Sequence, residues 1–133
     1  MKKTLSEQEI EGILRRVRPM PLSYYWSAVI GVMAYAGLSD LEVIELLNED
    51  LDLTGRVITV TSPEDVTVQR AVAISDELFE ILENHTSDKS DYLFSNIQAN
   101  GKKWFKSSFD RELAQRLPRD LEASQLTDSY GKL

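Results

Sequence analysis

The chain has 133 residues, of which 42% are hydrophobic and 28% charged, and its 15 basic and 22 acidic side chains give a net charge of −7. These values predict one globular domain, spanning residues 1–133, with a core of its own. Because there is no cysteine and one histidine, disulfide scaffolds, thiolate zinc sites, cysteine nucleophiles and multi-histidine metal sites are excluded. No apolar stretch has the length of a membrane span or the form of a signal segment, so we expect a cytoplasmic protein.

Charge is spread unevenly along the chain. Residues 19–98 carry three basic and fourteen acidic groups, whereas residues 1–18 and 99–133 each carry two more basic than acidic groups. The middle of the chain would repel a phosphate backbone, and both ends would tolerate one. Solvated faces on a globular domain are the simpler interpretation of the same pattern.

The first predicted element is a helix over residues 5–17. Ser6 and Glu9 have the spacing of a capping box, in which each side chain accepts a hydrogen bond from the backbone of the other residue. Leu5 and Ile10 have the spacing of a hydrophobic staple, which fixes the direction in which the chain enters the helix.

Two further helices are predicted before the middle of the chain. The one over 23–36 is apolar almost all round, so it should be central and buried, with Gly37 as its C-terminal cap. We expect its leading aromatic residues in the core: Tyr24, Tyr25 and Trp26. A short helix over 40–47 follows, for which Ser39 and Glu42 form a second capping box. Its predicted buried side consists of Leu41, Ile44 and Leu47.

Strand signals follow these helices. Residues 56–61 and 66–74 are rich in β-branched residues and alternate in polarity, with turn-forming residues between them, which predicts a β-hairpin. A helix is expected from Asp76 onward, and residues 92–94 form a short apolar stretch that should meet the core.

The C-terminal part has one clear helix signal. Residues 102–116 interleave apolar with basic side chains, and from Pro118 onward the pattern is weak. The order of elements predicts a mostly helical α+β domain with a small antiparallel sheet or hairpin packed on the helices.

Residues 36–52, Ala-Gly-Leu-Ser-Asp-Leu-Glu-Val-Ile-Glu-Leu-Leu-Asn-Glu-Asp-Leu-Asp, resemble the first signature box of the tyrosine recombinases, or phage integrases. Three shorter pieces are similar to further landmarks of the family's catalytic domain: residues 4–10 to its start, 70–74 to the end of its hairpin, and 92–94 to the next landmark. The resemblance covers residues 4–116 in order, and it implies the fold of that catalytic domain. The matching positions of the first box are Gly37, Leu38, Glu42, Leu46, Asp50, Leu51 and Asp52.

The catalytic positions that the resemblance implies are altered. In this family a tyrosine attacks DNA to form a phosphotyrosyl link, two arginines clamp the scissile phosphate, a hairpin lysine is the general acid, and histidines assist. The first arginine position is Ser39 here, whose hydroxyl carries no charge and whose spacing to Glu42 favours a capping role. The hairpin lysine position falls on Asp65 or its neighbour Glu64, where a carboxylate would repel the phosphate.

The family's second box, a His-x-x-Arg that opens a helix, is missing. The single histidine, His85, has no arginine three residues later, and the candidate start at residues 126–127 is followed by Asp-Ser-Tyr-Gly. The chain ends at Leu133, before the place of the nucleophile, and Tyr130 comes too early for that role. We therefore expect a degenerate, C-terminally truncated recombinase domain with no intact catalytic site, which does not act as an enzyme.

Basic side chains suggest that some contact with duplex DNA remains. The alternative for residues 102–116 is an amphipathic helix whose basic side chains only face solvent. The carboxylates of residues 40–52 lack the spacing of an EF-hand loop, so we expect no metal. The candidate DNA-binding residues are Arg70, Lys102, Lys103, Lys106 and Arg111.

Two partner classes remain open. Surface that missing C-terminal helices would cover suggests a homodimer or an active recombinase as a partner for a DNA-associated subunit. The alternative function is an acidic protein-interaction module with no DNA role, and an enzyme of unrelated chemistry ranks last. We expect no cofactor, no membrane and no small-molecule substrate.

Overall fold

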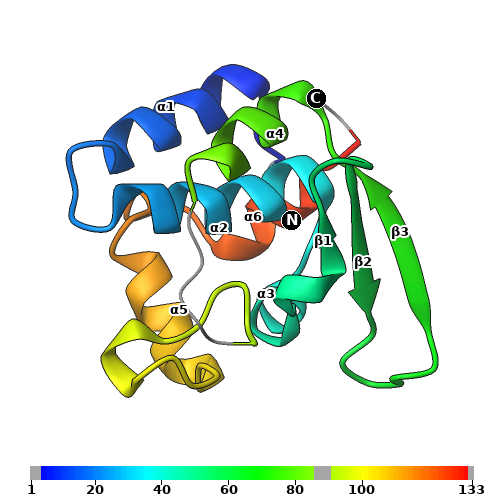
Figure 1. Cartoon of the computed structure of the whole chain (residues 1–133). Coiled ribbons are helices and arrows are strands. Elements are labelled where there is room, and N and C mark those ends of the chain that lie inside the picture. The colour runs from blue at the N-terminus through cyan, green and yellow to red at the C-terminus, as the bar shows by residue number, and fades with distance from the viewer. Residues whose placement is uncertain (1–3, 86–90, 132–133) are drawn as a thin grey trace.

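The computed structural model describes residues 4–85 and 91–131 and arranges them around one helix, α2 (Ser23–Ala36) (Figure 1). Ten of the fourteen residues of α2 are buried, because small and apolar side chains occur on every side of it. The prediction of a central, buried helix over 23–36 is confirmed. The helices in contact with it are α1 (Glu7–Val17), α3 (Asp40–Glu45), α4 (Asp76–Glu83) and α6 (Ala123–Asp128).

The first two helices begin and end as the sequence predicts. Ser6 Oγ accepts a hydrogen bond from Glu9 N at 3.1 Å, and the Glu9 carboxylate accepts one from Ser6 N at 3.0 Å. Leu5 and Ile10 are both buried, as a hydrophobic staple requires. Gly37 caps α2 with a φ of 75° and donates its N–H to the carbonyl of Met33.

The expectation that the leading aromatic residues of α2 lie in the core is right for two of the three. Tyr25 and Trp26 are buried, whereas Tyr24 is 65% exposed, because consecutive helix positions face different sides. The Tyr25 hydroxyl donates to the carbonyl of Ser95 at 2.9 Å and accepts from Trp104 Nε1 at 2.7 Å. This bridge joins α2 to the segment that precedes α5.

Helix α3 is shorter than predicted and buries a different set of residues. It ends at Glu45, and of the predicted buried set Ile44 is buried, Leu41 is 38% exposed and Leu47 is half-buried. The backbone becomes extended after the helix, so helical spacing does not apply there. The side chains that face the core beside Ile44 are Val43 and Leu46.

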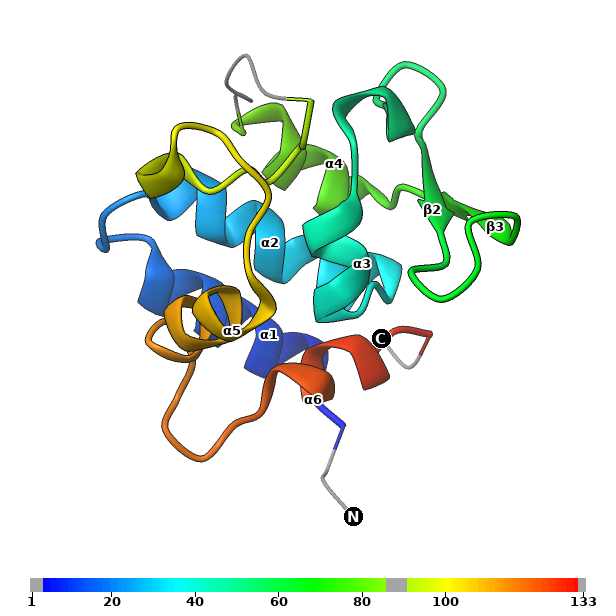
Figure 2. The same ribbon diagram turned by 90° about the horizontal axis from the view of Figure 1, so that it is seen from below.

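The predicted hairpin is confirmed, and it belongs to a three-stranded antiparallel sheet in the order β1–β2–β3. Strands β2 (Val57–Thr61) and β3 (Gln69–Ala73) pair along their whole length, with Thr59 opposite Ala71. Strand β1 (Leu51–Asp52), which the sequence pattern does not reveal, pairs with the other side of β2. Strand β3 is therefore an edge, and neither Figure 1 nor Figure 2 draws a helix or strand beyond it.

Two expectations for the C-terminal part are wrong. Helix α5 (Lys106–Ala114) starts later than the predicted 102, since Lys102 instead forms a backbone bridge with Asn96. After Pro118 the chain forms α6, whose short apolar pattern is too weak to predict a helix. The remaining connections contain two single-turn 3-10 helices, η1 (Asn48–Asp50) and η2 (Ile97–Ala99).

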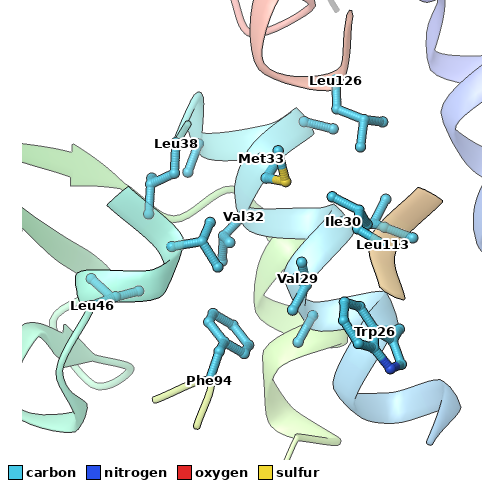
Figure 3. Close-up of a cluster of buried hydrophobic side chains, with 14 of the residues drawn as sticks. Trp26, Val29, Ile30, Val32, Met33, Leu38, Leu46, Phe94, Leu113 and Leu126 are labelled. Atoms are coloured by element: carbon cyan, nitrogen blue, oxygen red, sulfur yellow. The ribbon is translucent and has the colours of Figure 1, made fainter. Parts of the chain in front are cut away.

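The core lies on several sides of α2 (Figure 3). Phe94, from the predicted apolar stretch 92–94, is 1% exposed and packs beside α2, while Leu113 of α5 and Leu126 of α6 approach from other directions. The helices and the small sheet thus share one hydrophobic cluster, and the expected α+β fold is confirmed.

The last helix ties the start of the described chain to its end. The Ser129 hydroxyl accepts from Leu5 N at 2.8 Å and donates to the carbonyl of Gln125 at 2.6 Å, and the residue is completely buried. Thr127 Oγ1 donates to the carbonyl of Leu38 at 2.8 Å. Helix α6 is therefore fixed both to the entry of α1 and to the exit of α2.

Candidate functional site

The residues of the first signature box meet where α2 ends and α3 begins. Ser39 is the N-cap of α3: its Oγ accepts from Glu42 N at 3.2 Å, and Glu42 Oε1 accepts from Ser39 N at 2.9 Å. The predicted capping box is confirmed. The half-buried Ser39 hydroxyl is therefore engaged by the backbone of α3, and it offers no positive charge.

Arg70 reaches from β3 to the same carboxylate. Its Nη1 donates to Glu42 Oε2 at 2.5 Å and its Nη2 to Oε1 at 3.1 Å, which is a bidentate pair. Burial alone would raise the pKa of Glu42, but the hydrogen bonds from Arg70 and from the Ser39 backbone lower it below its ordinary value. A guanidinium held in this way takes a phosphate only if the pair with Glu42 breaks.

The other two acidic residues of α3 hold two more of the candidate cations. Lys103 Nζ forms an ion pair with Glu45. Lys106 Nζ lies 3.3 Å from Asp40 Oδ2 and 2.6 Å from Asp110 Oδ2. We call the three carboxylates of α3 the α3 acidic triad, and its members are Asp40, Glu42 and Glu45.

Two carboxyl groups share the surroundings of Lys106. Burial and the nearby Asp40 carboxylate raise the pKa of Asp110, although Lys106 opposes this shift. Burial would also raise the pKa of Asp40, but hydrogen bonds from Asp110, Leu41 and Lys106 lower it. Asp110 is therefore the member of this pair that takes up a proton first on acidification.

The remaining two candidate cations are not neutralised in this way. Lys102 and Arg111 are exposed, and neither forms an ion pair within residues 4–85 and 91–131. The aromatic neighbours expected beside them divide: Trp104 is buried, and Phe105 is 79% exposed. Of the five candidates, three are paired with the α3 acidic triad and two are available without the loss of an ion pair.

Asp65, at the position of the hairpin lysine, lies in the loop between β2 and β3. Its Oδ1 accepts from Thr67 N at 3.0 Å and from Thr67 Oγ1 at 2.6 Å, and these bonds lower the pKa of its carboxyl. Asp65 therefore stays negative at neutral pH. Among the described residues it has no contact with Ser39 or Arg70, whereas those two meet through Glu42.

Tyr130 packs against the glycine of the first signature box. A Cβ at Gly37 would lie 2.6 Å from Tyr130 Cδ1, and the φ of 75° independently favours glycine there. The pKa of Arg70 is raised first by its hydrogen bond to Glu42 and to a smaller extent by Tyr130. The late tyrosine therefore lies in the neighbourhood of Arg70, a position that the sequence does not predict.

His85 has a structural environment. Its Nε2 lies 3.1 Å from the carbonyl oxygen of Leu93, and its ring meets those of Tyr25 and Phe94 with centroids 5.7 and 5.2 Å away. Within the described residues, no group of three or more His, Asp or Glu side chains is arranged to hold a metal ion. No helix in that part of the chain is long and apolar enough to cross a membrane.

Sequence reasoning missed the role of the α3 acidic triad. Acidic residues at the start of a helix also complement its dipole, so their presence on α3 does not by itself reveal a partner. Glu42 and Arg70 are 28 positions apart, and only tertiary structure brings them together. A usable signal is that α3 carries three acidic residues and no basic one.

The comparisons with known proteins agree with this geometry. A sequence model of the phage integrase family matches residues 3–125, whereas no curated protein matches the chain. In fold the chain is similar to XerA recombinase, with a TM-score of 0.78 and 21% identity over 98% of this chain and 49% of that one. It is also similar to the integrase of mycobacterium phage Brujita, with a TM-score of 0.73 and 19% identity over 99% and 44% of the two chains.

A third similar structure was solved with nucleic acid. It is the Tn1549 transposon integrase in complex with circular intermediate DNA, with a TM-score of 0.68 and 16% identity over 98% of this chain and 53% of that one. The chain spans about half the length of the solved structures that it matches. Since the family match extends over nearly all of the sequence, and the helices and small sheet have the arrangement of these structures, the chain belongs to the phage integrase family.

Proposed function

We propose that this chain is a non-cleaving phage integrase relative, associated with DNA recombination or integration, which contacts duplex DNA weakly through basic side chains. The observation that carries the proposal is the engagement of Ser39 and Arg70 by Glu42. The first residue replaces a phosphate-clamping arginine with a helix cap. The second is a guanidinium that is already closed on a carboxylate.

The expected lack of cleavage follows from charge. Negative charge that develops on a scissile phosphate needs fixed donors and cations, and removal of one such group from a concerted site is usually severe. Here the Ser39 hydroxyl is a hydrogen-bond acceptor for the backbone, and Asp65 adds a negative charge at the hairpin position. Two of the family's catalytic positions therefore oppose the chemistry or do not contribute to it.

Weak DNA contact is supported by the exposed cations. Lys102 and Arg111 can meet phosphates directly, and the paired cations can join them where DNA competes with the α3 acidic triad. The net charge of −7 opposes this contact at long range. Such contacts carry no information about base sequence, because they reach only the phosphate backbone.

The test is a titration of a labelled generic duplex, followed by fluorescence anisotropy at about 50 and about 200 mM salt, because phosphate contacts weaken steeply over that range. We expect micromolar binding at the lower salt concentration that is largely lost at the higher one. The variant Lys102→Gln/Arg111→Gln should bind at least several-fold more weakly. Arg15→Gln/Arg16→Gln removes the same charge from the end of α1 and serves as the matched control.

Cleavage is tested separately with a nicked duplex that traps a covalent protein–DNA intermediate. We expect no adduct on a denaturing gel, even at a large excess of protein. An adduct that forms with the unaltered chain and disappears in Tyr130→Phe would refute the proposal and make that tyrosine a nucleophile.

The second candidate function is an acidic protein-interaction module with no DNA role. The concentration of negative charge in residues 19–98 favours it, as does the neutralisation of three cations by the α3 acidic triad. Absence of duplex binding even at about 50 mM salt would select this function over the first.

A further inference from the structure

The outer edge of β3 has unpaired backbone groups. In an antiparallel pair, alternate residues direct their N–H and C=O groups to the neighbouring strand. Ser62 N donates to Val68 O and Ile74 N donates to Arg56 O, which places every second residue from Val68 to Ile74 in the ladder with β2. The residues between them direct their backbone groups outward, and none of these groups bonds to another described residue. They are Gln69, Ala71 and Ala73.

This edge lacks the features that usually prevent strand addition. Natural edges are protected by lysine, proline, a bulge or a covering element. The stretch 66–74 contains neither lysine nor proline, and its one charged residue, Arg70, is held by Glu42. Val66 and Val68, which lead into the strand, are 77% and 54% exposed. Figures 1 and 2 show the outer side of β3 open in both views.

We propose that β3 pairs with β3 of a second copy of this chain, in an antiparallel register centred on Ala71, to form a continuous six-stranded sheet. Ala71 then lies opposite Ala71 of the second copy, and Gln69 lies opposite Ala73. All outward backbone groups of the strand meet outward groups of the other copy, which gives about six new hydrogen bonds. The inference goes beyond the proposed DNA contact and does not depend on it.

Side-chain pairing selects this register over its neighbour. With the axis at Ala71, Arg70 lies opposite Val72 of the second copy and Val68 opposite Ile74, so no like charges meet. A shift of the axis by one residue places Arg70 opposite Arg70, and like charges directly opposite each other destabilise a sheet. The side chains on the axis are small and exposed, so the strands can approach without displacing the core.

Charge gives this association a distinctive salt dependence. Each copy carries −7, so two copies repel one another at long range, and salt screens that repulsion. Self-association should therefore strengthen as salt rises, whereas DNA binding weakens. An edge contact buries little surface, so we expect a dissociation constant of about 0.1 to 1 mM.

The experiment combines sedimentation equilibrium with amide hydrogen exchange by NMR, at protein concentrations from about 10 µM to about 1 mM, which brackets a weak interface. The amides of Gln69, Ala71 and Ala73 should exchange rapidly in the dilute protein and at least several-fold more slowly in the concentrated one. The inward amides of Arg70 and Val72 should be protected throughout. A dimer whose outward β3 amides still exchange rapidly would show that another surface mediates association.

The variant Ala71→Lys places two lysines opposite each other on the axis and should weaken association at least tenfold. Ala114→Lys adds the same charge on the exposed side of α5 and should leave association unchanged. The proposal is overturned by a monomer at about 1 mM in high salt, or by a dimer that Ala71→Lys does not weaken. Neither result bears on the DNA titration, so failure of the two proposals can be told apart.

Discussion

Ser39 illustrates how one residue at a former catalytic position acquires a structural role. A serine N-cap satisfies a backbone N–H that an arginine side chain leaves unpaired, and its loss typically costs about 1 kcal/mol. We predict that Ser39→Ala lowers the free energy of unfolding by about that amount, measured by urea denaturation. Ser6→Ala removes the equivalent cap of α1 and should give a similar loss. An unchanged midpoint for Ser39→Ala would contradict the capping role.

The pair of Glu42 and Arg70 makes stability depend on pH. Because the pKa of Glu42 in the folded state lies below its ordinary value of 4.5, the ionised carboxylate stabilises the fold at neutral pH. That contribution is lost as the pH falls from the ordinary value through the lowered one. We predict that the unaltered chain loses more stability between about pH 7 and about pH 3.5 than Glu42→Gln does, measured by urea denaturation. Equal losses in the two proteins would exclude a stabilising role for the ionised carboxylate.

At the scale of elements, α3 acts as an intramolecular competitor for phosphate. It has six residues, three of which are acidic, and each of the three holds a cation from β3 or from the start of α5. We predict that Asp40→Asn/Glu45→Gln frees two lysines and raises affinity for a generic duplex about five- to tenfold at low salt, with a steeper salt dependence. Fluorescence anisotropy measures both quantities.

The control for this prediction removes equal charge from another helix. Glu77→Gln/Glu80→Gln on α4 changes the net charge by the same amount and leaves the α3 ion pairs intact. A similar gain in affinity from both double variants would mean that net charge governs DNA binding, and that α3 has no specific effect.

Elements with local signals are the ones that the sequence predicts well. The starts of α1 and α3 are determined by hydrogen bonds between residues three apart, so their capping boxes are visible in the sequence. The end of α3 and the start of α5 depend on packing and on a bridge between Lys102 and Asn96, which local patterns do not contain. Helix α6 is too short for its apolar spacing to stand out.

At the scale of the whole molecule, fold and site differ in how far they can be predicted. The family's landmarks, in order along the chain, predict the fold, and the comparisons confirm it. Substitution of the clamping position by Ser39 is also visible in the sequence. The state of the cations is not, because Arg70, Lys103 and Lys106 find their carboxylates at 28 or more positions away.

The placement of α6 has a consequence for the synthesis of this protein. Leu126 completes the core beside α2, and Ser129 binds the backbone of Leu5, so the earliest and latest residues of the described chain depend on each other. A ribosome that has made only the helices and the sheet has produced a domain with part of its core uncovered. Stable folding therefore waits until residue 129 has left the ribosome, and a nascent chain arrested before α6 should remain sensitive to protease.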